Sequence, residues 1–177
     1  MTTGPDSTEL RTVRVLQIPL GVQARTTQHF DELMREFALI SLDADRVRSA
    51  DDSARPVPHR LTDLVQELTE NFSAFTADVE AERDAALARG DAEIDLTYQL
   101  PAAAADASRR LGELLDEVDD YCRSGQHLIT LATPPESLAF RQWYLEEFIG
   151  QIEAGRDPIP WRDHVAEHHQ ADAWAKG

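Results

Sequence analysis

The stretch ESLAFRQWYLEEFIGQIEA, residues 136–154, carries more apolar side chains than one side of a helix can hold. It follows Pro134 and Pro135, which suit the start of a helix. Its apolar residues cover more than half of the helix circumference, and they are Leu138, Phe140, Trp143, Tyr144, Leu145, Phe148, Ile149 and Ile152. Such a helix is more often buried in its own domain, whereas an exposed one would bind a second copy or a helical partner.

Four other helices and three strands are expected around this helix. Apolar residues recur at helical spacing in four segments, which are 22–42, 61–75, 77–89 and 101–123. Alternating or β-branched apolar residues predict strands in three segments, which are 13–20, 94–98 and 127–133. This order of elements indicates a helix-dominated α+β fold with about five helices and a small sheet of about three strands.

The chain is expected to fold as one domain. A length of 177 residues with 42% hydrophobic side chains is enough for one sizeable core. Residues 1–10 are polar, so they are predicted to form a flexible tail. The domain then covers 11–155, with a charged connection at 43–59, and residues 156–177 are predicted to form a tail rich in His and Asp.

The charge and composition of the chain argue against several functions. It has 33 acidic against 17 basic residues, a formal net charge of −16, and a single lysine, Lys176. Nucleic-acid backbones and anionic membranes both require a basic surface, so neither is an expected partner. The one cysteine, Cys122, leaves no internal disulfide and no cysteine zinc site. Without a run of 18 apolar residues or a secretory signal, the chain is expected in the cytoplasm.

Four carboxylates gather on the polar face of the helix expected at 101–123, and they are Asp116, Glu117, Asp119 and Asp120. Such a cluster either holds a hard cation or binds a basic partner, although a solvated helix face is the more frequent role. Together with Trp143 and Tyr144, these acids are the predicted partner-binding residues. No catalytic residue and no cofactor is predicted, since the sequence has neither a nucleophile elbow nor a glycine-rich phosphate loop.

The segment LVQELTENF, residues 64–72, resembles the N-box of the histidine-kinase-like ATPases, especially the anti-sigma-factor serine kinases. In that family a helix offers a glutamate and, four residues later, an asparagine that helps hold the magnesium of the nucleotide. The resemblance therefore implies nucleotide binding by Glu67 and Asn71. Phe72 stands where the family usually has alanine, and the D-x-G-x-G motif does not occur. The implied protein is a degenerate nucleotide-binding module that does not turn over ATP.

The segment HVAEH, residues 164–168, fits the H-x-x-E-H pattern of the inverted zinc proteases. Histidines four residues apart share a helix face, and Glu167 could activate a metal-bound water. Only nine residues follow, whereas that family takes a further ligand from well downstream. A metal-dependent hydrolase that uses the C-terminal histidines His164, His168 and His169 is the second alternative, and a solvated terminus with no metal site is favoured over it.

Four other pieces of the chain are similar to small uncharacterised proteins of high-GC Gram-positive bacteria, and these pieces are 95–98, 114–123, 130–135 and 140–148. Such proteins are associated with partner-switching signalling by anti-sigma kinases, their antagonists and serine phosphatases. The resemblance implies a regulatory role and supplies no catalytic residue. The leading hypothesis is a non-enzymatic cytoplasmic protein that binds another protein, such as a signalling regulator, with a homodimer as a further expectation.

Overall fold

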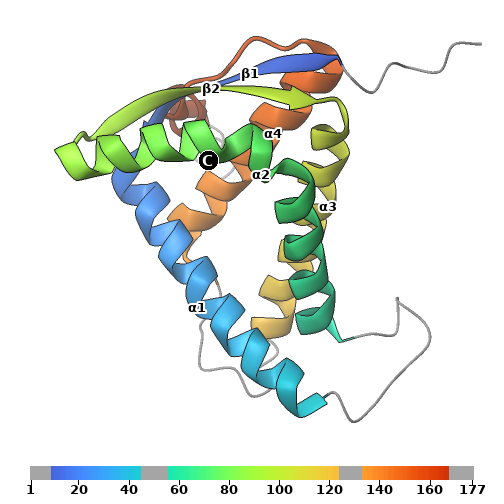
Figure 1. The fold of residues 1–177 in the computed structure, drawn as a ribbon. Coiled ribbons are helices and arrows are strands. Elements are labelled where there is room, and N and C mark those ends of the chain that lie inside the picture. Colours follow the sequence, from blue (N-terminus) through green and yellow to red (C-terminus); the bar gives the residue numbers. More distant parts are fainter. Residues whose placement is uncertain (1–8, 45–55, 124–132, 168–177) are drawn as a thin grey trace, which may run out of the picture.

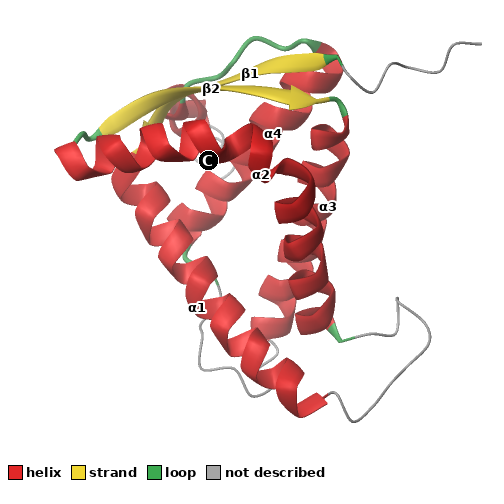
Figure 2. Ribbon diagram, in the orientation of Figure 1, coloured by secondary structure: helices red, strands yellow, loops and turns green. Residues whose placement is uncertain are grey.

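The computed structural model of the chain describes residues 9–44, 56–123 and 133–167. Their fold is helix-dominated α+β, with five helices and one small sheet (Figures 1 and 2). In chain order the elements are β1 (Leu10–Pro19), α1 (Leu20–Ala44), α2 (Val57–Arg89), β2 (Glu93–Pro101), α3 (Ala103–Arg123), α4 (Pro135–Ala154) and a short helix at 161–167. None of the helices in these residues is both long and apolar enough to cross a membrane.

The sheet of the described residues has two antiparallel strands, in which Val13 lies opposite Tyr98 and Val15 opposite Leu96. Side chains alternate along both strands, so one face of the sheet is buried and the other is exposed. A two-stranded sheet is marginal by itself, and it is stabilised here by the helices that cover its apolar face. Of the third strand expected at 127–133, residues 127–132 lie outside the described part of the chain, and Thr133 is described but is not in a strand.

Helix α2 differs from the sequence-based expectation, because the helices predicted at 61–75 and 77–89 form one continuous element of 33 residues. No glycine or proline interrupts the chain between them, so nothing forces a break. Its first part runs beside α3 and its last part lies along β2 (Figure 1). The helix begins within the expected connection at 43–59, since Pro58 is tolerated in the first turn. It ends at Gly90, whose φ of 79° is the left-handed conformation that glycine adopts readily.

Two clusters of buried side chains form the core. One lies under the sheet, where Val13 and Leu96 pack with Trp143 and Phe148 of α4. The other joins α1, α2 and α3, and its centre includes Phe37, Leu61, Leu64, Leu114 and Val118. The apolar α4 is therefore buried in its own domain, which was the favoured one of the two alternatives.

The first half of the predicted C-terminal tail packs against α4. The indole Nε1 of Trp143 donates a hydrogen bond of 2.8 Å to the carbonyl oxygen of Ile159. The side chain of Glu147, which is 1% exposed, accepts bonds from Arg156 and from the backbone N–H of Ile159. Burial raises the pKa of Glu147, although these donors act in the opposite direction. The segment is polar in composition, yet a few apolar residues and the ion pairs of Arg156 and Arg162 hold it against the rest of the domain.

Candidate functional site

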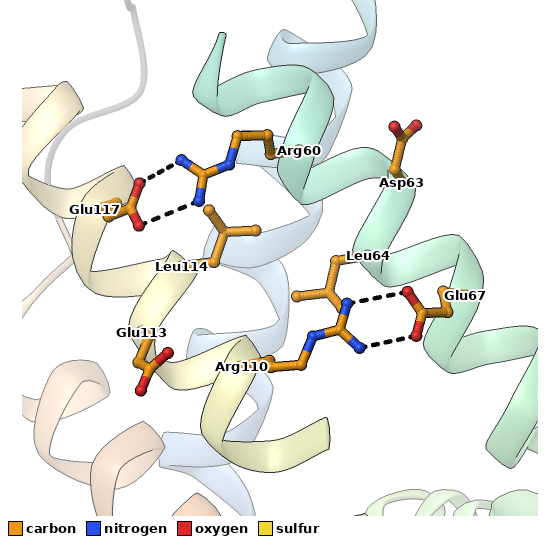
Figure 3. Close-up of a pocket in the computed structure, with 8 residues that line it drawn as sticks. All are labelled: Arg60, Asp63, Leu64, Glu67, Arg110, Glu113, Leu114 and Glu117. Carbon is orange, nitrogen blue, oxygen red and sulfur yellow. Dashed lines mark hydrogen bonds and ion pairs between the residues drawn. The ribbon is translucent and has the colours of Figure 1, made fainter. Parts of the chain in front are cut away.

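A groove of about 290 Å³ lies between α2 and α3. Figure 3 shows that its floor consists of two leucines, while charged side chains stand along both walls. The lining residues are Arg60, Asp63, Leu64 and Glu67 from α2, and Arg110, Glu113, Leu114 and Glu117 from α3. The lining therefore contains four carboxylates and two guanidinium groups, which leaves the groove with an excess of negative charge.

Two ion pairs cross the groove from one helix to the other (Figure 3). Arg60 on α2 donates to both oxygens of Glu117 on α3, at 2.6 and 3.3 Å. Arg110 on α3 donates to both oxygens of Glu67 on α2, at 2.9 and 3.1 Å. Each pair is bidentate, which fixes the orientation of both side chains better than a single contact does.

The groove has an approximate twofold symmetry that is visible in the sequence. Residues 60–67 read RLTDLVQE and residues 110–117 read RLGELLDE, so arginine, two leucines and the final glutamate recur at the same positions. The two helices run antiparallel, and each arginine therefore faces the glutamate of the other copy. Asp63 and Glu113 occupy the matching fourth position of each segment. The repeated sequence explains why the same arginine–glutamate pair occurs twice in the groove.

The ion pair with Arg110 stabilises the charged form of Glu67. The hydrogen bonds from this guanidinium lower the pKa of Glu67 below its usual value, while the carboxylate raises the pKa of Arg110. Both side chains are about half exposed, so solvent screens the attraction between them. The pair orients the carboxylate and contributes little to the stability of the fold.

Replacing Arg110 with methionine is expected to raise the pKa of Glu67 toward its usual value. The lowered pKa means that the ion pair acts at neutral pH and is lost as the pH falls through the range in which Glu67 becomes protonated. A carboxyl NMR titration of both proteins measures this change directly. Arg123→Met, which removes an exposed arginine paired with Asp120 outside the groove, serves as the control and should leave the titration of Glu67 unchanged.

Of the two residues of the N-box resemblance, Glu67 lines the groove and Asn71 does not. Both oxygens of Glu67 accept hydrogen bonds from Arg110. Asn71 is exposed one turn further along α2 and is not among the residues that line the groove. Glu67 was predicted to bind a nucleotide, but in the structure it lines the groove and binds Arg110. The sequence did not predict the other charged residues of the groove, which are Arg60, Asp63, Arg110 and Glu113. The repeated octapeptide was the signal that could have identified all of them.

The four acids predicted to bind a partner are used in three different ways. Glu117 lies in the groove, and Asp120 forms an exposed ion pair with Arg123 on its own helix. Asp116 and Asp119 both bind Arg141 of α4, at 2.6 and 2.9 Å. Asp119 is buried, and it also accepts a hydrogen bond of 2.6 Å from the hydroxyl of Thr133. Asp119 is therefore not accessible to a partner, whereas Asp116, Glu117 and Asp120 are exposed.

Of the two aromatic residues predicted to bind a partner, Trp143 lies in the core and Tyr144 is partly buried against it. Trp143 is 1% exposed, and its ring contacts those of Phe140 and Trp161. The hydroxyl groups of Tyr144 and Tyr98 are 2.6 Å apart and share a hydrogen bond. Burial raises the pKa of both tyrosines. Trp143 is therefore not accessible to a partner, whereas Tyr144 is only partly buried.

The first histidine of the H-x-x-E-H segment is also part of the packed structure. The side chain of His164 is buried, and its ring stacks on Trp161 with the ring centres 5.7 Å apart. His168 and His169 lie outside the described residues. Within 9–44, 56–123 and 133–167, no group of three His, Cys, Asp or Glu side chains could hold a metal ion.

The fold and the groove together define a helix-dominated α+β protein with an acidic, ion-paired groove between two antiparallel helices. The chain matches no protein-family model, and neither a curated protein nor a solved structure is significantly similar to it. The groove is consequently the best guide to function.

Proposed function

We propose that the protein is a non-enzymatic regulatory protein that binds a basic segment of another protein in the α2–α3 groove. The observation that supports this proposal is the groove itself, in which four carboxylates stand around a floor of two leucines. Apolar contact with Leu64 and Leu114 would hold a partner side chain, while the carboxylates would select for basic residues beside it. A role in partner-switching signalling in the cytoplasm is the setting that we propose for this interaction.

The ion pairs of the groove leave room for additional donors. An ionised carboxylate has about four sites that accept hydrogen bonds, and Arg60 or Arg110 uses two of them. Because exposed ion pairs are weak, a basic side chain of a partner can join or replace the arginine at low cost. The net charge of −16 would also speed the approach of a basic protein.

The spacing of the groove suggests the form of the partner. Glu67 lies seven positions after Arg60, and Glu117 lies seven positions after Arg110. In a helix this corresponds to about 10 Å along the axis. A partner helix that carries basic residues about two turns apart, with an apolar residue between them, would match both ends of the groove. The approximate twofold symmetry would allow either direction of binding.

A synthetic peptide tests the proposal, and we choose an amphipathic helix with two arginines seven residues apart and a leucine between them. Binding to the full chain is measured by fluorescence anisotropy at low salt and at high salt. The double variant Asp63→Asn/Glu113→Gln should weaken binding by up to about tenfold, because it removes two exposed charge contacts. Added salt should weaken binding to the unmodified chain in the same way.

The matched control is Asp78→Asn/Glu146→Gln, which makes the same chemical changes at two exposed positions outside the groove. This control variant should bind the peptide as the unmodified chain does, apart from a small effect of net charge. An equal loss of peptide affinity in both double variants would show that binding depends on the net charge of the chain and not on the groove. The proposal would then fail. A peptide with glutamine in place of both arginines should not bind.

The nucleotide-binding alternative is tested separately by calorimetry with ATP and magnesium. It has less support than peptide binding, because the groove beside Glu67 carries more negative than positive charge and a nucleotide phosphate would be repelled. Heat of binding that disappears in Asn71→Ala would establish this alternative. Absence of heat in the unmodified chain would remove it.

A further inference from the structure

We draw no further inference here: the strongest candidate, the crevice between α1 and α2 beside Gln23, Asp31 and Arg83, is open to solvent, and the Oε1 of Gln23, which has no hydrogen-bond partner among the described residues, is itself shielded from solvent, so nothing in the structure shows what would occupy the crevice.

Discussion

Replacing Trp143 with alanine is expected to lower the free energy of unfolding by about 3–5 kcal/mol. The indole is 1% exposed and packs against Phe140 and against Trp161 of the short C-terminal helix. Truncation leaves a cavity that the surrounding rings can fill only in part. It also leaves the carbonyl oxygen of Ile159 without the hydrogen bond that the indole donates. The variant should therefore loosen residues 155–167 as well as the core under the sheet.

Chemical denaturation followed by circular dichroism measures this loss. A domain of this size is stable by about 5–15 kcal/mol, so Trp143→Ala should unfold at a much lower denaturant concentration or be partly unfolded without denaturant. Trp143→Phe keeps an aromatic ring and should lose less, about 1–3 kcal/mol, mainly through the unpaired carbonyl. Leu39→Ala, at a position 69% exposed, is the control and should change little. A loss in Trp143→Ala no greater than in Leu39→Ala would show that the indole is not a core residue.

The position of Trp143 shows what sequence periodicity can and cannot predict. The apolar pattern of 136–154 predicted both the helix and its burial. The spacing of apolar residues indicates the local helical conformation, and their number indicates that the helix is buried. It did not predict what covers the helix. Ile159 and Trp161 lie in a segment that reads as a polar tail, and their contacts with α4 depend on tertiary structure that no local pattern encodes. The short sheet illustrates the same limit, since strand residues were predicted but their pairing was not.

More of the charged residues of the groove could have been predicted from the sequence. Glu67 and Glu117 were both named, one for nucleotide binding and one for an acidic surface, yet each is bound to an arginine of the other helix. The repeated octapeptide at 60–67 and 110–117 indicates that two similar helix faces can pair antiparallel. This short repeat is visible in the sequence alone. The volume of the groove and its leucine floor required the structure.

Replacing Asp119 with alanine is expected to lower the free energy of unfolding by about 3 kcal/mol, because it removes one partner from a buried ion pair. Asp119 is 4% exposed, and it accepts hydrogen bonds from the backbone and hydroxyl of Thr133 as well as from Arg141. Arg141 keeps Asp116, which limits the loss. The contacts join α3, α4 and the residue before α4, so their removal should separate the two helices locally.

Asp120→Ala is the matched control, since it removes the neighbouring carboxylate from the same helix. One residue turns a helix by about 100°, so Asp119 points toward α4 while Asp120 stays exposed beside Arg123. Urea denaturation should show a clear loss for Asp119→Ala and none for Asp120→Ala. Asp119→Asn should fall between them, because the amide oxygen can still accept a bond from Thr133 but the charge facing Arg141 is gone. Equal stability of Asp119→Ala and Asp120→Ala would contradict a structural role for Asp119. Asp119 would then again be a candidate for binding a partner.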